Sequence, residues 1–172
     1  MSQPYNIIQS KYEELPNNIE AEQSVIGSIL LANEIFDEVN LIISNKNFYD
    51  PIHKKIYEAL EKLIFSGLLA NPITLKNYFE KEKDDLNIPE YLVKITKFST
   101  SSRQAIEYSK LVFDLYVKRE LIKISGEVID QAKLNDLNND GKKIIENYEK
   151  SLFDLAEKGS FSSSFIKFDE AM

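Results

Sequence analysis

The chain has 172 residues, a formal net charge of −7 and 43% hydrophobic residues, which fits one globular domain or a small domain with an appendage. It has no cysteine and one histidine, which excludes disulfides and leaves no His or Cys cluster for a metal. The excess of acidic residues argues against binding to nucleic-acid phosphates, because such binding depends on clustered Lys and Arg. The first residues are mostly polar, and no apolar run approaches the roughly 20 residues of a membrane span, so we expect a cytoplasmic protein.

Nearly every segment is predicted to be helical. After a loose tail over residues 1–15, a helix is predicted over 18–32, with Asn17 as its cap and Glu20 completing a capping box. A glycine in the middle of a helix costs about 1 kcal/mol relative to alanine, so Gly27 predicts a close neighbour beside this helix.

Four shorter helices are predicted next. Asp50 is a good cap and Pro51 suits the first helical position, so one helix starts there, and Gly67 is its expected stop. The other three are predicted over residues 34–44, from Pro72 or Thr74, and from about Pro89. No stretch shows clean two-residue alternation bounded by turns, so we predict essentially no sheet and an all-α fold.

The character of the sequence changes after the serine-rich loop that ends at Ser102. Residues 103–134 contain no proline and one glycine, which predicts one long helix or two nearly continuous ones. A dense turn signal over 135–141 separates them from a second amphipathic helix over 142–158, which Gly159 is expected to stop. Two antiparallel helices with a short polar turn make a helical hairpin.

The long helix carries apolar residues over a wide arc, because neighbouring positions differ by about 100° around a helix axis. One face can pack on residues 145–155 of the same hairpin. The other can pack on the globular part or on a second chain, and the sequence leaves both possibilities open. The candidates for self-association are Phe113, Val117, Leu121, Ile124 and Val128, or the neighbouring stripe Leu111, Leu115, Ile122 and Ile129.

Motifs for catalysis are absent from the sequence. The nearest approach to a phosphate-binding loop, Gly141-Lys142-Lys143, lacks the first glycine and the hydroxyl residue. The only histidine, His53, has no predicted nucleophile or acid beside it, which favours a packing or hydrogen-bonding role. We therefore predict no catalytic, cofactor-binding or metal-binding residues and no enzymatic activity for these residues alone.

Two stretches carry a resemblance to a known family. They are NIEAEQSVIGSILL over residues 18–31 and FYDPIHKKIYEA over residues 48–59. With weaker matches such as Tyr91-Leu92, they make the sequence similar to the N-terminal domain of bacterial replicative DNA helicases, the DnaB family. One departure is Asn87-Ile-Pro-Glu90, which stands where the family usually has a glycine pair, so the loop there is expected to differ in shape.

The resemblance implies a compact multi-helix bundle followed by a long helical hairpin. It also implies hairpins that pair as dimers, possibly a trimer of dimers, above a hexameric ATPase ring, and docking of the C-terminal domain of primase. The implied function is assembly and primase binding in chromosome replication and primosome formation. ATP and Mg²⁺ would serve only a motor domain beyond Met172. The alternative is a freestanding all-helical adaptor or regulator of replication without a motor domain.

The expected organisation follows from the helix pattern and the resemblance together. A tail over 1–15 precedes a globular subdomain over 16–100, a hairpin over 101–159, and a linker over 160–172 that leads to the motor domain. The polar turn of the hairpin contains one apolar residue, Leu137, and Leu134 precedes it. We expect Leu134 and Leu137 to contribute to primase docking.

Overall fold

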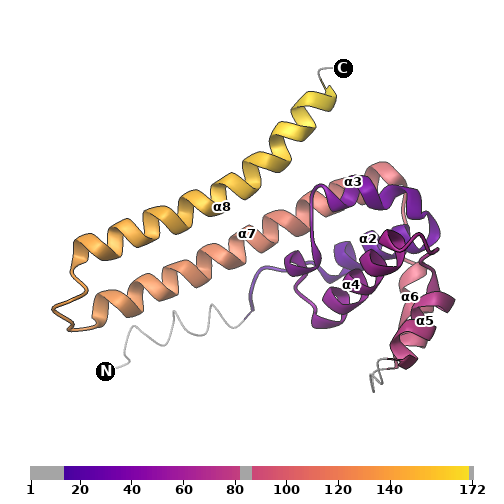
Figure 1. Ribbon diagram of the computed structural model, residues 1–172, viewed down its shortest axis with the longest axis horizontal. Helices are drawn as coiled ribbons and strands as arrows, with labels where there is room; N and C mark the ends of the chain where they lie inside the picture. Colours follow the sequence, from indigo (N-terminus) through magenta and orange to yellow (C-terminus); the bar gives the residue numbers. More distant parts are fainter. Residues whose placement is uncertain (1–13, 82–86, 171–172) are drawn as a thin grey trace. The chain divides into compact units, whose positions relative to one another are not determined.

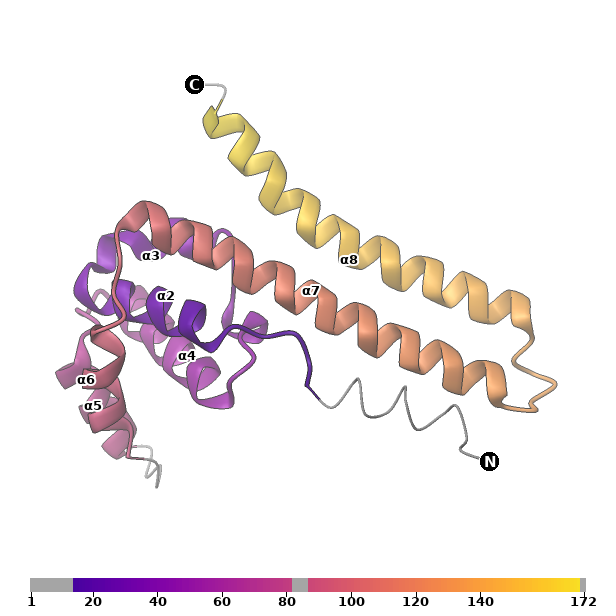
Figure 2. The same ribbon diagram turned by 180° about the vertical axis from the view of Figure 1, so that it is seen from behind.

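The computed structural model describes residues 14–81 and 87–170, with side chains described as far as Lys158. These residues form seven α-helices and two short 3-10 helices with no strand among them, so the all-α prediction is confirmed. The chain divides into a globular unit, Asn18–Tyr116, and a second unit that contains Val117–Met172 and the residues before Asn18, here called the hairpin unit (Figures 1 and 2). The tail predicted over 1–15 lies almost entirely outside the described residues.

The first described helix, α2 (Ile19–Leu31), is capped by Asn18 and not by Asn17. The Asn18 side-chain oxygen accepts a hydrogen bond from the backbone N–H of Ala21 at 2.9 Å. The Asn17 amide instead donates to the carbonyl of Leu15 at 2.9 Å. The predicted cap was therefore wrong by one residue, and Glu20 stands one position too early for a capping box.

The close neighbour predicted beside Gly27 is confirmed. A Cβ atom on Gly27 would meet the backbone carbonyl oxygen of Ile95 and would lie 3.3 Å from the backbone nitrogen of Ser99. Ile95 belongs to α6 (Ile88–Thr96), so glycine lets the backbones of α2 and α6 approach. This approach fixes α6 against the first helix of the globular unit.

The single helix predicted over 34–44 is replaced by shorter elements. A 3-10 helix, η1 (Asn33–Ile35), leads into α3 (Phe36–Asn40), and a second, η2 (Asn45–Asn47), follows. Asparagine side chains break up this region because they offer the backbone alternative hydrogen bonds. The Asn47 side chain accepts from the backbone N–H of Ser44 at 2.7 Å, which closes a capping box over η2.

The side chain of Asn33 joins two distant segments. Its Oδ1 accepts from the backbone N–H of Ala70 at 2.8 Å, and its Nδ2 donates to the Ala70 carbonyl at 2.8 Å. The same Nδ2 donates to the carbonyl of Ile29 at 2.7 Å. The C-terminal end of α2 is thereby tied to the segment that enters α5 (Pro72–Lys81).

The helix predicted from Asp50-Pro51 is confirmed at both ends as α4 (Pro51–Phe65). The Asp50 carboxylate accepts from the backbone N–H of Ile52 at 2.8 Å. Gly67 has a φ of +73° and follows the helix. The N–H groups of Gly67 and Leu68 donate to the carbonyls of Ile64 and Leu63 at 2.9 and 3.0 Å, which is the Schellman pattern of a helix end.

The core of the globular unit gathers apolar side chains from α2 to the beginning of α7. Phe36, Phe48 and Tyr57 are among its largest fully buried members. The Tyr57 ring lies 5.7 Å from that of Phe36 and 5.0 Å from that of Phe48, measured between centroids. Helix α6 contributes Ile88, Leu92 and Ile95, so its inner face is part of this core.

The long helix predicted after Ser102 is confirmed as one uninterrupted helix, α7 (Ser102–Lys133). A turn follows, and α8 (Gly141–Glu170) returns beside the second half of α7 (Figures 1 and 2). The expectation that Gly159 stops the second helix was wrong, because α8 continues through it. Glycine costs only about 1 kcal/mol inside a helix, and no proline follows to break the backbone pattern. The linker expected over 160–172 stays a prediction.

Candidate docking surfaces and a buried polar network

Each helix of the hairpin unit has a row of side chains that are partly covered or buried. In α7 the row comprises Val117, Glu120, Ile124, Val128 and Gln131. In α8 it comprises Ile144, Tyr148, Ser151 and Leu155. Spacings of three and four residues place each row on one helix face. Near the turn, Asn139 Nδ2 donates to Gln131 Oε1 at 2.6 Å.

The pKa of Tyr148 is raised, first by its partial burial and then by the charges of Glu127 and Asp130. These two carboxylates lie on α7, so the phenol of α8 is close to the first hairpin helix. The apolar residues 145 and 152, expected to pack inside the hairpin, are exposed instead. Tyr148 and Leu155 of the expected stretch are covered, and Ile144 and Ser151 are covered in place of Ile145 and Leu152.

The predicted self-association stripe divides between different environments. Phe113 is half-buried and packs against the core of the globular unit. Val117, Ile124 and Val128 belong to the partly covered row of α7. Leu121 is the exception, because 40% of its surface is exposed in the single chain. Self-association through these residues stays a prediction.

Large apolar side chains remain exposed on both hairpin helices. They are Leu121 and Ile129 on α7 and Ile145, Leu152 and Phe153 on α8. Phe153 was not identified from the sequence. Its exposure depends on which face of α8 is covered in the hairpin. Exposed apolar side chains on neighbouring helices are typical of a contact with another molecule. We call these five residues the hairpin apolar surface.

The hairpin tip places both predicted docking residues in solvent. Leu134 is exposed, and Leu137 is fully exposed. The turn is held by its own polar groups, since the carboxylate of Asp136 accepts from the backbone N–H of Asn138 at 2.9 Å. Lys143 Nζ donates to the carbonyl of Asn138 at 3.0 Å. Packing of the fully exposed Leu137 therefore does not hold the turn.

A buried polar network connects three helices of the globular unit. His53 at the start of α4 is fully buried, and its Nδ1 lies 2.6 Å from Glu22 Oε2 on α2. Its Nε2 lies 2.7 Å from the hydroxyl of Tyr91 on α6. Gln23 Nε2 donates to the same hydroxyl at 3.1 Å. The Glu22 carboxylate also accepts from the backbone N–H groups of Tyr49 and Asp50.

One arrangement of protons satisfies every member of this network. With a neutral imidazole, His53 donates from Nδ1 to Glu22 and accepts at Nε2 from the Tyr91 hydroxyl, which accepts from Gln23. The sequence predicted a packing or local hydrogen-bonding role for His53, but its hydrogen bonds are long-range. The partners were not predicted, because Glu22 and Tyr91 come from other helices. Burial raises the pKa of Tyr91, so its hydroxyl stays protonated.

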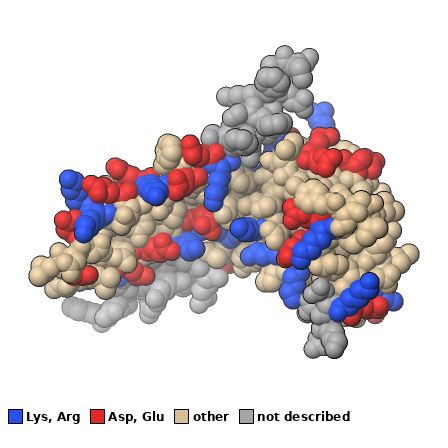
Figure 3. All heavy atoms as spheres, in the orientation of Figure 1, with Lys and Arg blue, Asp and Glu red and all other residues tan. Residues whose placement is uncertain are grey.

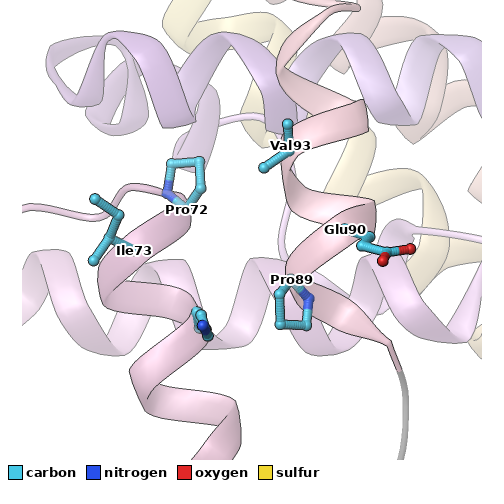
Figure 4. A pocket seen from close by; sticks show the side chains of 6 residues that line it. Pro72, Ile73, Pro89, Glu90 and Val93 are labelled. Carbon is cyan, nitrogen blue, oxygen red and sulfur yellow. The ribbon is translucent and has the colours of Figure 1, made fainter.

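A second exposed apolar feature lies between α5 and α6. A groove of about 440 Å³ is lined by Pro72, Ile73, Lys76, Pro89, Glu90 and Val93. Figure 4 shows Pro72 and Ile73 on the α5 wall and Pro89 and Val93 on the facing α6 wall. The groove belongs entirely to the globular unit. Sequence reasoning did not identify it, because it depends on how two short helices pair.

Features of other functional classes are missing from the part of the chain that the structure describes. Within residues 14–81 and 87–170, no three His, Cys, Asp or Glu side chains are placed to hold a metal ion. None of the helices examined there combines the length and apolar character needed to cross a membrane. On the face in Figure 3, acidic and basic side chains are interspersed along the surface.

Comparisons with known proteins agree with this architecture. The sequence model of the family described as DnaB-like helicase N terminal domain matches residues 14–114. The curated protein "Replicative DNA helicase DnaB" of Rickettsia conorii is 38% identical over 155 residues, which cover 89% of this chain and 31% of that protein. The protein of the same name from Rickettsia typhi is 40% identical over 155 residues, with the same coverage of 89% and 31%.

The fold is also similar to a solved structure. The crystal structure of the N-terminal domain of DnaB helicase from Mycobacterium tuberculosis matches with a TM-score of 0.75 and 22% sequence identity. The match covers 82% of this chain and 99% of that chain. The chain belongs to the DnaB-like helicase N-terminal domain family. It spans about a third of the length of the curated relatives that it matches.

Proposed function

We propose that this chain is the assembly and partner-docking domain of a hexameric replicative DNA helicase that acts in chromosome replication and primosome formation. Family membership supports the proposal, together with relatives named as replicative DNA helicases. The 172 residues contain no phosphate-binding loop. ATP hydrolysis, with its ATP and Mg²⁺, would therefore belong to another part of a longer protein.

The hairpin apolar surface is the observation that supports assembly most directly. Leu121 and Ile129 on α7 are 40% and 52% exposed, and α8 exposes Phe153 as well. Pairing of two hairpins would bury these side chains, and burial of apolar surface contributes roughly 25 cal/mol per Å². A two-fold pair uses the same surface on both copies, so one row of residues serves both partners.

The test is the particle mass of residues 1–172 by light scattering across a concentration series. The variant Leu121→Asp, Ile129→Asp places charges on the hairpin apolar surface and should give a smaller particle of unchanged helicity. The matched control is Leu134→Asp, Leu137→Asp, which makes the same change of charge at the tip and should keep the mass of the unaltered chain. An unaltered chain that is monomeric at every concentration would contradict assembly through the hairpin.

Docking of the C-terminal domain of primase is proposed for the hairpin tip. Leu137 is fully exposed on a turn that polar groups hold in shape, and Leu134 is exposed beside it. A few residues usually dominate such a contact. Calorimetric titration with the cognate primase domain should show binding at least tenfold weaker for Leu134→Ala, Leu137→Ala, equivalent to about 1.4 kcal/mol.

The control for this titration is Leu41→Ala, which truncates a leucine of the globular unit that is as exposed as Leu134. It should leave the affinity for primase unchanged. Equal affinity of the tip variant and the unaltered chain would move the primase contact away from the tip. Measured mass and helicity must stay the same in both variants, so that a change in affinity reports the contact itself.

A further inference from the structure

The groove between α5 and α6 has two apolar walls that face solvent. Ile73 on α5 is 72% exposed and Val93 on α6 is 56% exposed, and two prolines line the groove beside them. Prolines at these positions begin both helices and are fixed in backbone conformation. The apolar surface here is therefore rigid. Because it faces solvent, packing within the chain does not explain its apolar side chains.

The α6 wall is held in place from its inner side. Leu92 and Ile95 are buried in the core, and the Tyr91 hydroxyl is fixed by His53 and Gln23. The close approach of Gly27 to the Ile95 carbonyl restrains the same helix. These three contacts leave the outer side of α6, with Pro89 and Val93, as a preformed surface. A preformed site avoids the cost of ordering side chains when a partner binds.

Charge is placed at the α5 wall of the groove. Lys76 lines it and forms an exposed ion pair with Glu80, with 3.8 Å between Nζ and the carboxylate. An exposed ion pair contributes little to stability, so the ammonium group can exchange Glu80 for an acidic group on an occupant. The carboxylate of Glu90 points away from α5 in Figure 4, so it belongs to the rim of the groove.

We propose that the α5–α6 groove binds an amphipathic α-helix of a partner protein, which places apolar residues between Ile73 and Val93 and an acidic residue beside Lys76. A helix that lays its apolar face into a groove is anchored by residues three or four positions apart. This surface is separate from the hairpin tip, and the inference does not depend on the primase contact proposed there.

The size of the groove favours a helix over a second globular unit as its occupant. Six residues line it, whereas each side of a standard protein–protein interface has about 20 to 30 residues. Two globular units that met only at this groove would bury too little surface for a stable dimer. One helix from another protein needs only a few anchoring residues, which suits a groove lined by six.

The experiment uses isotopically labelled residues 1–172 and a synthetic alanine-based peptide of about 18 residues, long enough to be helical. The peptide carries leucines at positions i, i+4 and i+7 and a glutamate beside them. Its addition should shift the amide NMR signals of residues 73–76 and 90–93. Val93→Asp should weaken binding at least tenfold. The control Leu41→Asp changes a side chain of matched exposure, 57% against 56%, and should have no effect.

A charge reversal tests the role of Lys76. Lys76→Glu should weaken binding of the glutamate peptide about two- to fivefold, as expected for one exposed ion pair, and a lysine in place of that glutamate should restore it. Three results would overturn the proposal. They are an absence of shifts in the groove at millimolar peptide, equal affinity for the Val93→Asp variant, and groove signals that move with protein concentration alone. The last result would make the groove a self-association surface. None of the three results would change the family to which the chain belongs.

Discussion

Glu22 and His53 are 31 positions apart in the sequence, yet Glu22 Oε2 and His53 Nδ1 lie 2.6 Å apart and both side chains are buried. The carboxylate is not held by the imidazole alone, because two backbone N–H groups at the start of α4 also donate to it. A buried carboxylate is tolerated when all its acceptor positions are used in this way. The pair therefore determines how α2 and the start of α4 meet.

We predict that Glu22→Ala costs about 1 to 3 kcal/mol of stability, the range for buried donors left without their acceptor. The change leaves His53 and the N–H groups before α4 without their acceptor. Glu20→Ala is the matched control, since Glu20 lies two residues away on the same helix and is exposed. Urea unfolding of both variants measures the difference. A loss below 1 kcal/mol for Glu22→Ala would show that the network contributes little.

Gly27→Ala is predicted to destabilise the globular unit by about 1 to 3 kcal/mol, because the added methyl group meets the backbone of α6. Gly126→Ala is the control in α7, where a Cβ atom has open space around it. It should stabilise the chain by about 0.5 to 1 kcal/mol through helix propensity. Thermal unfolding followed by circular dichroism should thus show shifts of opposite sign. Shifts of the same sign would contradict the close approach of α2 and α6.

Stability should decline at alkaline pH because of Tyr57. Burial, and then the charge of Glu61, raise the pKa of this phenol above its ordinary value near 10. The folded state therefore keeps the proton that the unfolded state loses, so the contribution is complete below about pH 10 and is lost as the pH rises above it. Urea midpoints measured from about pH 8 to 11 should fall less steeply for Tyr57→Phe. An identical decline in both proteins would rule Tyr57 out as the cause.

Residues 1–172 are predicted to hydrolyse no ATP and to separate no DNA strands. The reason is the absence of a phosphate-binding loop from the sequence. Phosphate release in the presence of ATP and Mg²⁺ measures the first activity, and a labelled fork substrate measures the second. Turnover that follows the chain through several purification columns would refute the prediction.

Binding to single-stranded DNA is predicted to be weak at physiological salt. The net charge of −7 disfavours binding to phosphates, and on the face in Figure 3 the basic side chains are interspersed with acidic ones. Fluorescence anisotropy at about 0.15 M salt, where the Debye length is about 8 Å, measures the affinity. A submicromolar dissociation constant would overturn the prediction.

Local signals predicted much of the fold. Asp50-Pro51 and Gly67 marked the ends of α4 because capping and left-handed backbone geometry depend on nearby residues. Gly27 predicted a close contact, because glycine destabilises the interior of a helix and is expected there where a neighbour leaves no room for a side chain. The end of α8 could not be predicted in the same way. Gly159 weakens a helix without breaking it, and the outcome depends on a small balance of energies.

The sites were harder to predict, because they combine residues from separate helices. His53 looked isolated in the sequence, and its partners Glu22 and Tyr91 become neighbours only when α2, α4 and α6 pack. The exposure of Phe153 depends on the register of α8, and a shift of one residue would have covered a different row. The groove at Ile73 and Val93 similarly requires the pairing of two short helices.

The paired hydrogen bonds between Asn33 and Ala70 depend on an intact side-chain amide, so deamidation of Asn33 would change them. Hydrolysis of the Asn33 amide to a carboxylate would preserve the shape of the side chain and its bond from the Ala70 N–H. The nitrogen that now donates to the carbonyls of Ala70 and Ile29 would become an oxygen facing both of them. Two attractive contacts would turn repulsive at once. Deamidation at this single position would therefore separate the end of α2 from the entry to α5 without altering any apolar residue of the core.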